Sequence, residues 1–415
     1  MHHVLVDESL TLTGDASHEF RQNSPAGGWF PALQGLSWCI TASNLPYADL
    51  FFSPHLKRIF ISSSSPWRNY GVPRDILPAI ASRIAALPTS ALQYLRVGIS
   101  WHYWMPWAYF KDSLSHLVLR CGSSLTEFAS PIPLSDAAIN HLIHLPHLHT
   151  WHVECPPPNY STSSLPPVFP PLTELALGEG AACGWLSLFR RLEAGVPVTQ
   201  GVTTLSKAKE SLQFLDVEST LSPIIDVEFT SPIQIFHNLV SLSVEAHCHG
   251  KDGRGQCAFK LNDDDIAELA VALPQLEFLL LGHPCSENAC PTTTACLLSI
   301  SVYCPKLEVL EIHFNTTNIV GDLKNILADP KFEALRSLPR GTLPHLNVYR
   351  TPLALNELGF ETVAKGMVGI FPSLQHCGGI KGAWGGVNGR IEELRKMVSL
   401  PDASSLRVTS GFSFA

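Results

Sequence analysis

The sequence is poor in charged residues and has no long hydrophobic run. Only 15 % of its 415 residues are Asp, Glu, Lys or Arg, against a usual share of about 25 %. Together with 45 % hydrophobic residues, this composition excludes a largely disordered chain. No window approaches the ~20 apolar residues of a membrane-spanning helix, and Asp7 and Glu8 interrupt the place of a secretory signal. We therefore expect no membrane association and a location in the cytoplasm or nucleus.

Clusters of basic residues are also lacking. The chain has 28 Lys and Arg against 36 Asp and Glu, a net charge of −8. Its longest positive clusters are pairs such as Lys57-Arg58. Proteins that grip nucleic acid usually carry a concentrated basic surface, so we expect no nucleic acid partner. The 11 Cys are an odd number scattered from Cys39 to Cys377, which is typical of reduced thiols inside a cell rather than of a disulfide framework.

What the chain does contain is a repeat with the pattern apolar-x-x-apolar-x-apolar. Copies begin at Leu56, Leu92, Leu148, Leu172, Leu212, Leu239, Leu276, Leu307 and Leu343, and weaker copies begin at Leu33, Leu125 and Leu374. From Leu56 to Leu374 they recur about every 32 residues, a spacing typical of repeat architectures. Because alternate residues of a strand face opposite ways, each copy predicts a short strand with its apolar positions inward and the intervening positions exposed.

The segments between copies indicate helices. Ranges 75–87, 136–145, 263–273, 292–304 and 356–371 are amphipathic and each ends just before a proline, which cannot continue a helix. Ser135 and Asn262 are the predicted N-caps of two of these helices.

A helix, a proline and a short strand together form one unit, and stacked units bury a continuous core. The sequence thus predicts an α/β, leucine-rich-repeat-like solenoid with parallel short strands on one face and helices on the other. We expect an irregular segment over 1–30 and the solenoid over 31–378. Residues 379–415 are predicted to form a Gly-rich linker, a short helix at 391–397 and a C-terminal tail.

Several stretches resemble one family. They are GSSLTEF (122–128), PLSDAAI (133–139), LHTWHVECPP (148–157), FPPLTEL (169–175), LLLGHPC (279–285) and IHFNTTNI (312–319). Together they resemble fungal, basidiomycete-type F-box proteins with irregular leucine-rich repeats, over residues 30–380. The resemblance implies that the repeats recruit a substrate protein to a cullin-RING ubiquitin ligase. Residues 1–30 are too few and too polar for an F-box, so the cullin-RING adaptor is expected as a partner only of a longer form that has one.

The residues that could carry chemistry are better explained by structural roles. A metal site is suggested by His247, Cys248, His249, Cys257, Cys285, Cys290, Cys296 and Cys304, but the gaps exceed the usual ligand spacing. The glycines of 253–255 lack the preceding strand of a dinucleotide fingerprint. The acidic run 263–265 lacks the spaced ligands of a calcium loop and suits the first turn of a helix. No nucleophile elbow or zincin motif occurs, so we expect no cofactor, no metal and no enzymatic activity.

The exposed positions of the predicted strands form the candidate binding surface. The predicted partner-binding residues are Glu154, Glu174, Phe214, Asp216, Glu218, Glu245, Phe278, Leu280, Glu311, His313 and Tyr349. Acidic side chains dominate the middle of the exposed strand positions as a whole, and the few basic ones, Arg58 and Arg96, lie near the start. Acidic side chains steer a basic partner, and aromatic anchors are typical of interface hot spots. The alternative is that these are ordinary solvated strand residues.

We therefore predict a protein-interaction scaffold that resembles the substrate-recruiting region of an F-box receptor and binds a partner protein on its strand face. The alternative is a free-standing leucine-rich-repeat regulator unconnected with ubiquitin.

Overall fold

The computed structural model of the chain describes residues 3–6, 29–41, 44–63, 77–98, 108–153, 171–178, 210–219, 225–246, 259–282, 290–330, 343–348, 357–378 and 383–399, with a few single residues besides. The strands are β1 (His3–Val6), β2 (Gly35–Ile40), β3 (Arg58–Ser63), β4 (Tyr94–Gly98), β5 (Glu127–Ser130), β6 (Thr150–Val153), β7 (Glu174–Leu177), β8 (Phe214–Ser219), β9 (Ser241–Ala246), β10 (Phe278–Gly282), β11 (Val309–Ile312), β12 (His345–Asn347) and β13 (His376–Gly378). The α-helices are α3 (Leu77–Ala85), α4 (Ala108–Arg120), α5 (Asp136–Ile143), α8 (Val227–Thr230), α9 (Asp263–Ala272), α10 (Cys296–Tyr303), α11 (Ile319–Ala328), α13 (Glu357–Ile370) and α14 (Ala383–Ser399). Two short 3₁₀ helices, η1 (Leu45–Phe51) and η4 (Ser231–Ile233), complete the described elements.

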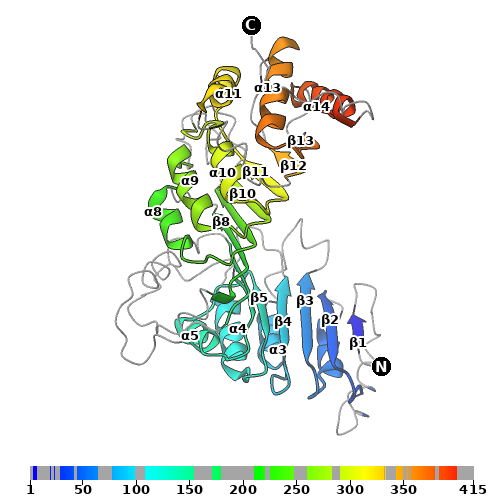
Figure 1. The fold of residues 1–415 in the computed structure, drawn as a ribbon. Coiled ribbons are helices and arrows are strands. Elements are labelled where there is room, and N and C mark those ends of the chain that lie inside the picture. The colour runs from blue at the N-terminus through cyan, green and yellow to red at the C-terminus, as the bar shows by residue number, and fades with distance from the viewer. Residues whose placement is uncertain are drawn as a thin grey trace, which may run out of the picture. The chain divides into compact units, whose positions relative to one another are not determined.

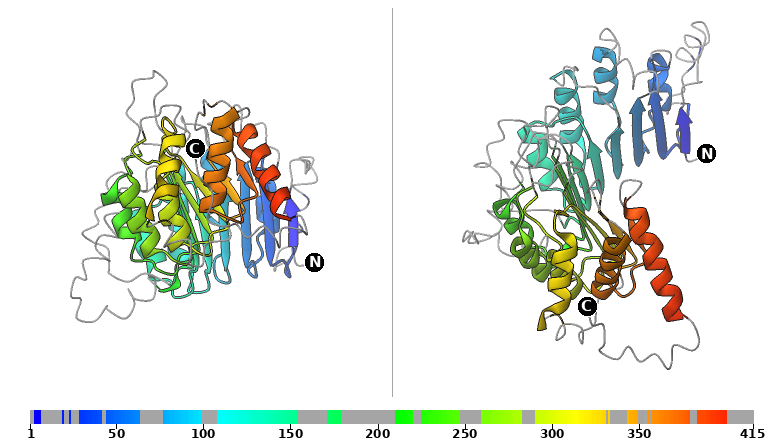
Figure 2. Two further views of the ribbon diagram at one scale, coloured as in Figure 1. Left: turned by 45° about the horizontal axis from the view of Figure 1, so that its top comes forward. Right: turned by 90° about the horizontal axis from the view of Figure 1, so that it is seen from above.

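The chain divides into two compact units, Met1–Leu221 and Ser222–Ala415. In unit 1, strands β1 to β8 are parallel and each pairs with the next along the chain. In unit 2, β9 to β13 do the same. Helices α3, α4 and α5 lie on one side of the strands of unit 1, and α9, α10 and α11 on one side of those of unit 2 (Figures 1 and 2). This confirms the predicted fold class, since strands form one face and helices the other, as in a leucine-rich-repeat-like solenoid.

The core consists of the apolar positions of the repeat. The inward residues of neighbouring strands are paired in register, so they stack in rows across each unit. One such row in unit 1 contains Ile59, Leu95, Phe128, Trp151, Leu175 and Leu215, all of them buried. Each large apolar side chain buried in this way stabilises the fold by about 1.5–3 kcal/mol. The repeat pattern therefore sets both the position of each strand and the face that it buries.

A ladder of backbone carbonyls joins successive repeats. One carbonyl just before each strand accepts two N–H groups from the next repeat: that of Lys57 accepts from Gln93 (2.8 Å) and Tyr94 (2.9 Å). The carbonyl of Gln93 accepts in turn from Thr126 (2.8 Å) and Glu127 (3.1 Å). The same arrangement recurs at Gln34, Thr126, His149 and Thr173 in unit 1, and at Val240, Glu277 and Pro344 in unit 2. Main-chain N–H groups thus bind each ladder carbonyl from repeat to repeat, and the hydroxyls of Thr126 and Thr173 add a side-chain bond to the carbonyls of Gln93 (2.9 Å) and His149 (3.2 Å).

The predicted helix caps are confirmed. Ser135 Oγ accepts from Ala138 N at 3.3 Å. Asn262 Oδ1 accepts from the N–H groups of residues 264 and 265, and Asp265 Oδ2 accepts from Asn262 N at 2.9 Å, which completes a capping box. The Asp263 carboxylate accepts from both the N–H (2.8 Å) and the hydroxyl (2.6 Å) of Thr293, so it ties α9 to the segment before α10.

No described helix has the length and apolar character needed to cross a bilayer.

The structure differs from expectation at both ends of the solenoid. Strand β1 lies inside the segment 1–30, for which the sequence predicts no regular element. Helix α14 begins at Ala383 rather than at residue 391, and it includes Gly385, Gly386 and Gly389 of the predicted linker. Glycine costs about 1 kcal/mol in a helix interior. Here burial of Trp384, Val387 and Ile391 on one face of α14 outweighs that cost.

The last strand of unit 2 is covered by a side chain of α14. Asn388 Oδ1 accepts from Cys377 N at 2.7 Å, and Asn388 Nδ2 donates to Cys377 O at 2.7 Å. The amide thus binds β13 with the same donor and acceptor that a further strand would use. Helix α14 therefore acts as the cap of this edge.

Candidate functional site

The outward positions of β3 to β8 form a continuous surface, which we call the unit 1 strand face. It consists of two rows in register. The first row is Arg58, Tyr94, Glu127, Thr150, Glu174 and Phe214, and the second row is Phe60, Arg96, Ala129, His152, Ala176 and Asp216. Neighbours within a row are about 4.8 Å apart because they occupy adjacent paired strands. Ala129 is buried and the other members are half-buried or exposed.

The charges of this face are separated along the row direction. Arg58 and Arg96 lie on β3 and β4, whereas the carboxylates lie on β5, β7 and β8. The Arg96 guanidinium lies over the Phe60 ring, 5.8 Å from its centroid, so a cation–π contact restrains it. At the far end, Phe214 is 44 % exposed. Both ends of the face thus present an aromatic ring next to charge.

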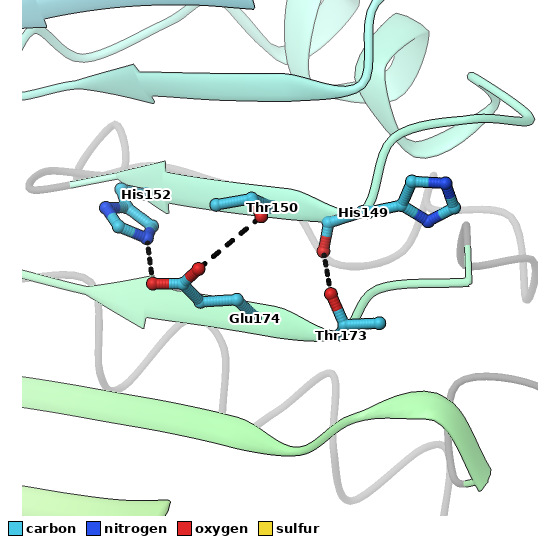
Figure 3. A network of polar contacts seen from close by, with 5 residues as sticks. All are labelled: His149, Thr150, His152, Thr173 and Glu174. Carbon is cyan, nitrogen blue, oxygen red and sulfur yellow. Dashed lines mark hydrogen bonds and ion pairs between the residues drawn. The ribbon is translucent and has the colours of Figure 1, made fainter.

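A polar network orients one of the carboxylates (Figure 3). His152 Nε2 lies 2.8 Å from Glu174 Oε1, and the Thr150 hydroxyl donates to Glu174 Oε2 over a long 3.5 Å. The side chains of His152 and Glu174 remain 31 % and 42 % exposed. The Glu174 carboxylate is therefore held in one direction by two residues of β6 and still faces solvent.

The charges of the face also act on one another through Glu127. Partial burial raises the pKa of Glu127 above its usual value, and the Glu174 carboxylate raises it further. His152, Arg96 and Arg58 act in the opposite direction and lower it. A cation placed over β5 would stabilise the charged form of Glu127. The two arginines and the carboxylates are thus close enough to form one electrostatic surface.

The structure places the predicted partner-binding residues in several locations. Glu174, Phe214 and Asp216 lie together on the unit 1 strand face. In unit 2, Glu245, Phe278 and Glu311 lie on β9, β10 and β11 and are half-buried. Glu218 belongs to β8, but its side chain is outside the described part of the chain, as are Glu154 and Tyr349.

Two predicted contact residues are wrong because they are buried. Leu280 lies in register between Ser243 and Glu311, but only 7 % of it is exposed. Strand alternation gives the direction of a side chain, not how far its neighbours cover it. His313 is 1 % exposed because β11 ends at Ile312, so the alternation no longer applies. Its Cβ packs against Gly282, which has a φ of 120°.

Sequence reasoning missed Phe60 and Thr150 as members of the face. Phe60 lies between the inward residues Ile59 and Ile61 of a repeat copy, and that position is the signal that could have identified it. Thr150 directly precedes the inward Trp151 in the same way.

Most of the metal and nucleotide candidates lie outside the part of the chain that the structure describes. Among the described residues, no group of three or more His, Cys, Asp and Glu side chains is placed to hold a metal ion. His247, Cys248, His249, Cys257, Cys285 and the glycines of 253–255 lie outside the described ranges. Cys290, Cys296 and Cys304 are buried.

We expect the buried thiols to resist alkylation in the native protein. Burial raises the pKa of Cys121, Cys304 and Cys377 to about 12, and it raises that of Cys296 well above its usual value. Since the thiolate is the nucleophile, iodoacetamide at mildly alkaline pH should leave these four unmodified until the chain unfolds. Peptide mass spectrometry measures each site, with the half-buried Cys39 as the internal comparison. Equal modification in native and denatured protein would contradict the buried placement.

Comparison with protein-family models and with curated proteins found no match for the chain.

Proposed function

We propose that the chain is a non-enzymatic protein-interaction scaffold that binds a partner protein with the unit 1 strand face. The observation that carries this proposal is the pair of registered rows, in which aromatic side chains lie among charged ones. Rigid aromatic anchors with a polar surround are typical of interface hot spots. Strand pairing fixes the backbone of the face before a partner arrives, which lowers the entropy lost on binding.

The resemblance to F-box proteins suggests what the partner is used for. On that basis, the bound protein would be a substrate delivered to a cullin-RING ubiquitin ligase in the cytoplasm or nucleus. The ligase adaptor belongs to this proposal only for a form of the protein that carries an F-box. The alternative function is a free-standing regulator that holds its partner without ubiquitination.

Charge reversal on the face tests the proposal. We expect Glu174→Lys with Asp216→Lys to reduce recovery of the partner about tenfold or more, which corresponds to about 1.4 kcal/mol of binding free energy. The measurement is affinity capture from cells of the source organism with quantitative mass spectrometry. The matched control reverses two exposed carboxylates on helices, Glu268→Lys and Glu392→Lys, and should leave recovery unchanged.

Two outcomes of the capture experiment test the proposed face and its link to ubiquitin. If wild type and the face variant recover the same proteins in equal amounts, the strand face does not bind the partner and the proposal is wrong. If the adaptor and a cullin accompany the partner, the ubiquitin-linked function is supported over the free-standing regulator.

A further inference from the structure

We propose that the unit 1 strand face binds a bipolar segment of its partner, with acidic side chains at one end and basic side chains at the other, laid across the strands. This inference rests on the proposed function and specifies the chemistry of the partner. It also departs from the sequence-based expectation of a basic partner, because the structure places Arg58 and Arg96 in the same registered rows as the carboxylates.

The placement of charge selects against a segment of one sign that spans the whole face. A wholly basic segment laid from β3 to β8 would place cations over Arg58 and Arg96 as well as over Glu127, Glu174 and Asp216. Juxtaposed like charges cost binding energy and select against such partners. A wholly acidic segment meets the same repulsion at the other end. Only a segment whose sign changes along its length complements both ends.

The spacing of the strands sets the length of the segment. In the second row, Arg96 on β4 and Asp216 on β8 are separated by the strands that carry Ala129, His152 and Ala176. Four strand spacings amount to roughly 19 Å. An extended chain covers that distance in about six residues, and a helix in about 13.

The charged groups are held in place before binding. Arg96 lies over the ring of Phe60, and Glu174 is oriented by His152 and Thr150. Side chains that are already restrained lose less entropy when a partner orders them. Their fixed spacing therefore favours a partner with a matching separation of charges over one with the same composition in another order.

Synthetic peptides of defined charge order test the inference on the full chain. The first peptide has two Asp, a spacer of about six Leu, Ser and Gly residues, and two Lys. The second has the same composition with alternating charges, and the third replaces both Asp by Lys. Fluorescence anisotropy at low ionic strength, where electrostatic contacts are least screened, gives each dissociation constant. We expect the bipolar peptide to bind about tenfold tighter than either of the others.

A variant without the two arginines of the face should prefer the basic peptide to the bipolar one. Arg58→Glu with Arg96→Glu turns the whole face acidic, so the basic peptide should become the tightest ligand and the bipolar peptide should weaken about tenfold. Lys306→Glu with Lys324→Glu makes the same change in net charge at exposed positions outside the face and should keep the wild-type order. Circular dichroism verifies that each variant is folded.

The possible failures are distinguishable. If wild type prefers the basic peptide, or does not distinguish charge order, the bipolar inference is wrong while the capture experiment on Glu174 and Asp216 can still support partner binding. Binding of none of the peptides at their highest soluble concentration would also overturn the inference. If the capture experiment fails as well, the proposed function itself is wrong.

Discussion

Replacement of Trp151 by alanine is expected to lower the free energy of unfolding by about 3–5 kcal/mol. Trp151 is wholly buried on β6, in register between Phe128 of β5 and Leu175 of β7. Removing the indole from this row leaves a cavity that the paired strands cannot close without breaking their register. Urea unfolding followed by far-ultraviolet circular dichroism measures the loss.

The neighbour of Trp151 on the same strand supplies the control. His152 faces the opposite way and is partly exposed, so His152→Ala should change stability by about 1 kcal/mol or less. Trp151→Phe keeps an aromatic ring in the row and should lose less than the alanine variant. Similar losses at 151 and 152 would contradict the alternation of buried and exposed positions in β6.

Asn388→Ala is expected to destabilise unit 2 by about 2–6 kcal/mol. It removes the partners of both the N–H and the carbonyl of Cys377, a wholly buried residue. Burying each of these groups unsatisfied costs about 1–3 kcal/mol, which exceeds the few tenths gained because alanine is the better helix former. The thermal unfolding midpoint measures the loss, and size-exclusion chromatography detects association through the uncovered edge of β13.

Gly389→Ala is the matched control for Asn388→Ala. It lies next to Asn388 in α14, and no heavy atom is within 4 Å of a Cβ at this position. Alanine should therefore leave stability unchanged or raise it by about 0.5–1 kcal/mol. If both variants unfold at the same temperature and stay monodisperse, Asn388 does not cap the sheet edge.

Most of the fold could be predicted from the sequence because one pattern sets both strand position and burial. Each repeat copy coincides with a strand, from β2 after Leu33 to β13 after Leu374. The pattern does not extend to β1, so that strand was not predicted. The start of α14 was missed because Gly385, Gly386 and Gly389 argue locally for a linker, whereas packing of Trp384 and Val387 decides the outcome.

The candidate site could be predicted only in part, because its rows join strands far apart in the sequence. Alternation within one strand correctly predicts that the side chains of Glu174, Phe214 and Asp216 face outward. It does not show how deeply a side chain such as Leu280 is covered by its neighbours. Nor does it show that Phe60 and Arg96 are paired in register. That pairing follows from aligning one repeat copy with the next, because the buried apolar positions of the copies set the register, and not from alternation within one strand.

The carbonyl ladder that joins the repeats allows the outward residues of the strands to vary without changing how the strands are spaced. Lys57, Gln93, Thr126, His149 and Thr173 hold successive strands with main-chain carbonyls, so the spacing does not depend on the outward side chains of the strands. The outward residues can then be exchanged one at a time while the pitch between neighbouring positions stays constant. A single outward substitution thus changes the chemistry of the strand face and leaves the spacing between neighbouring strands as it is.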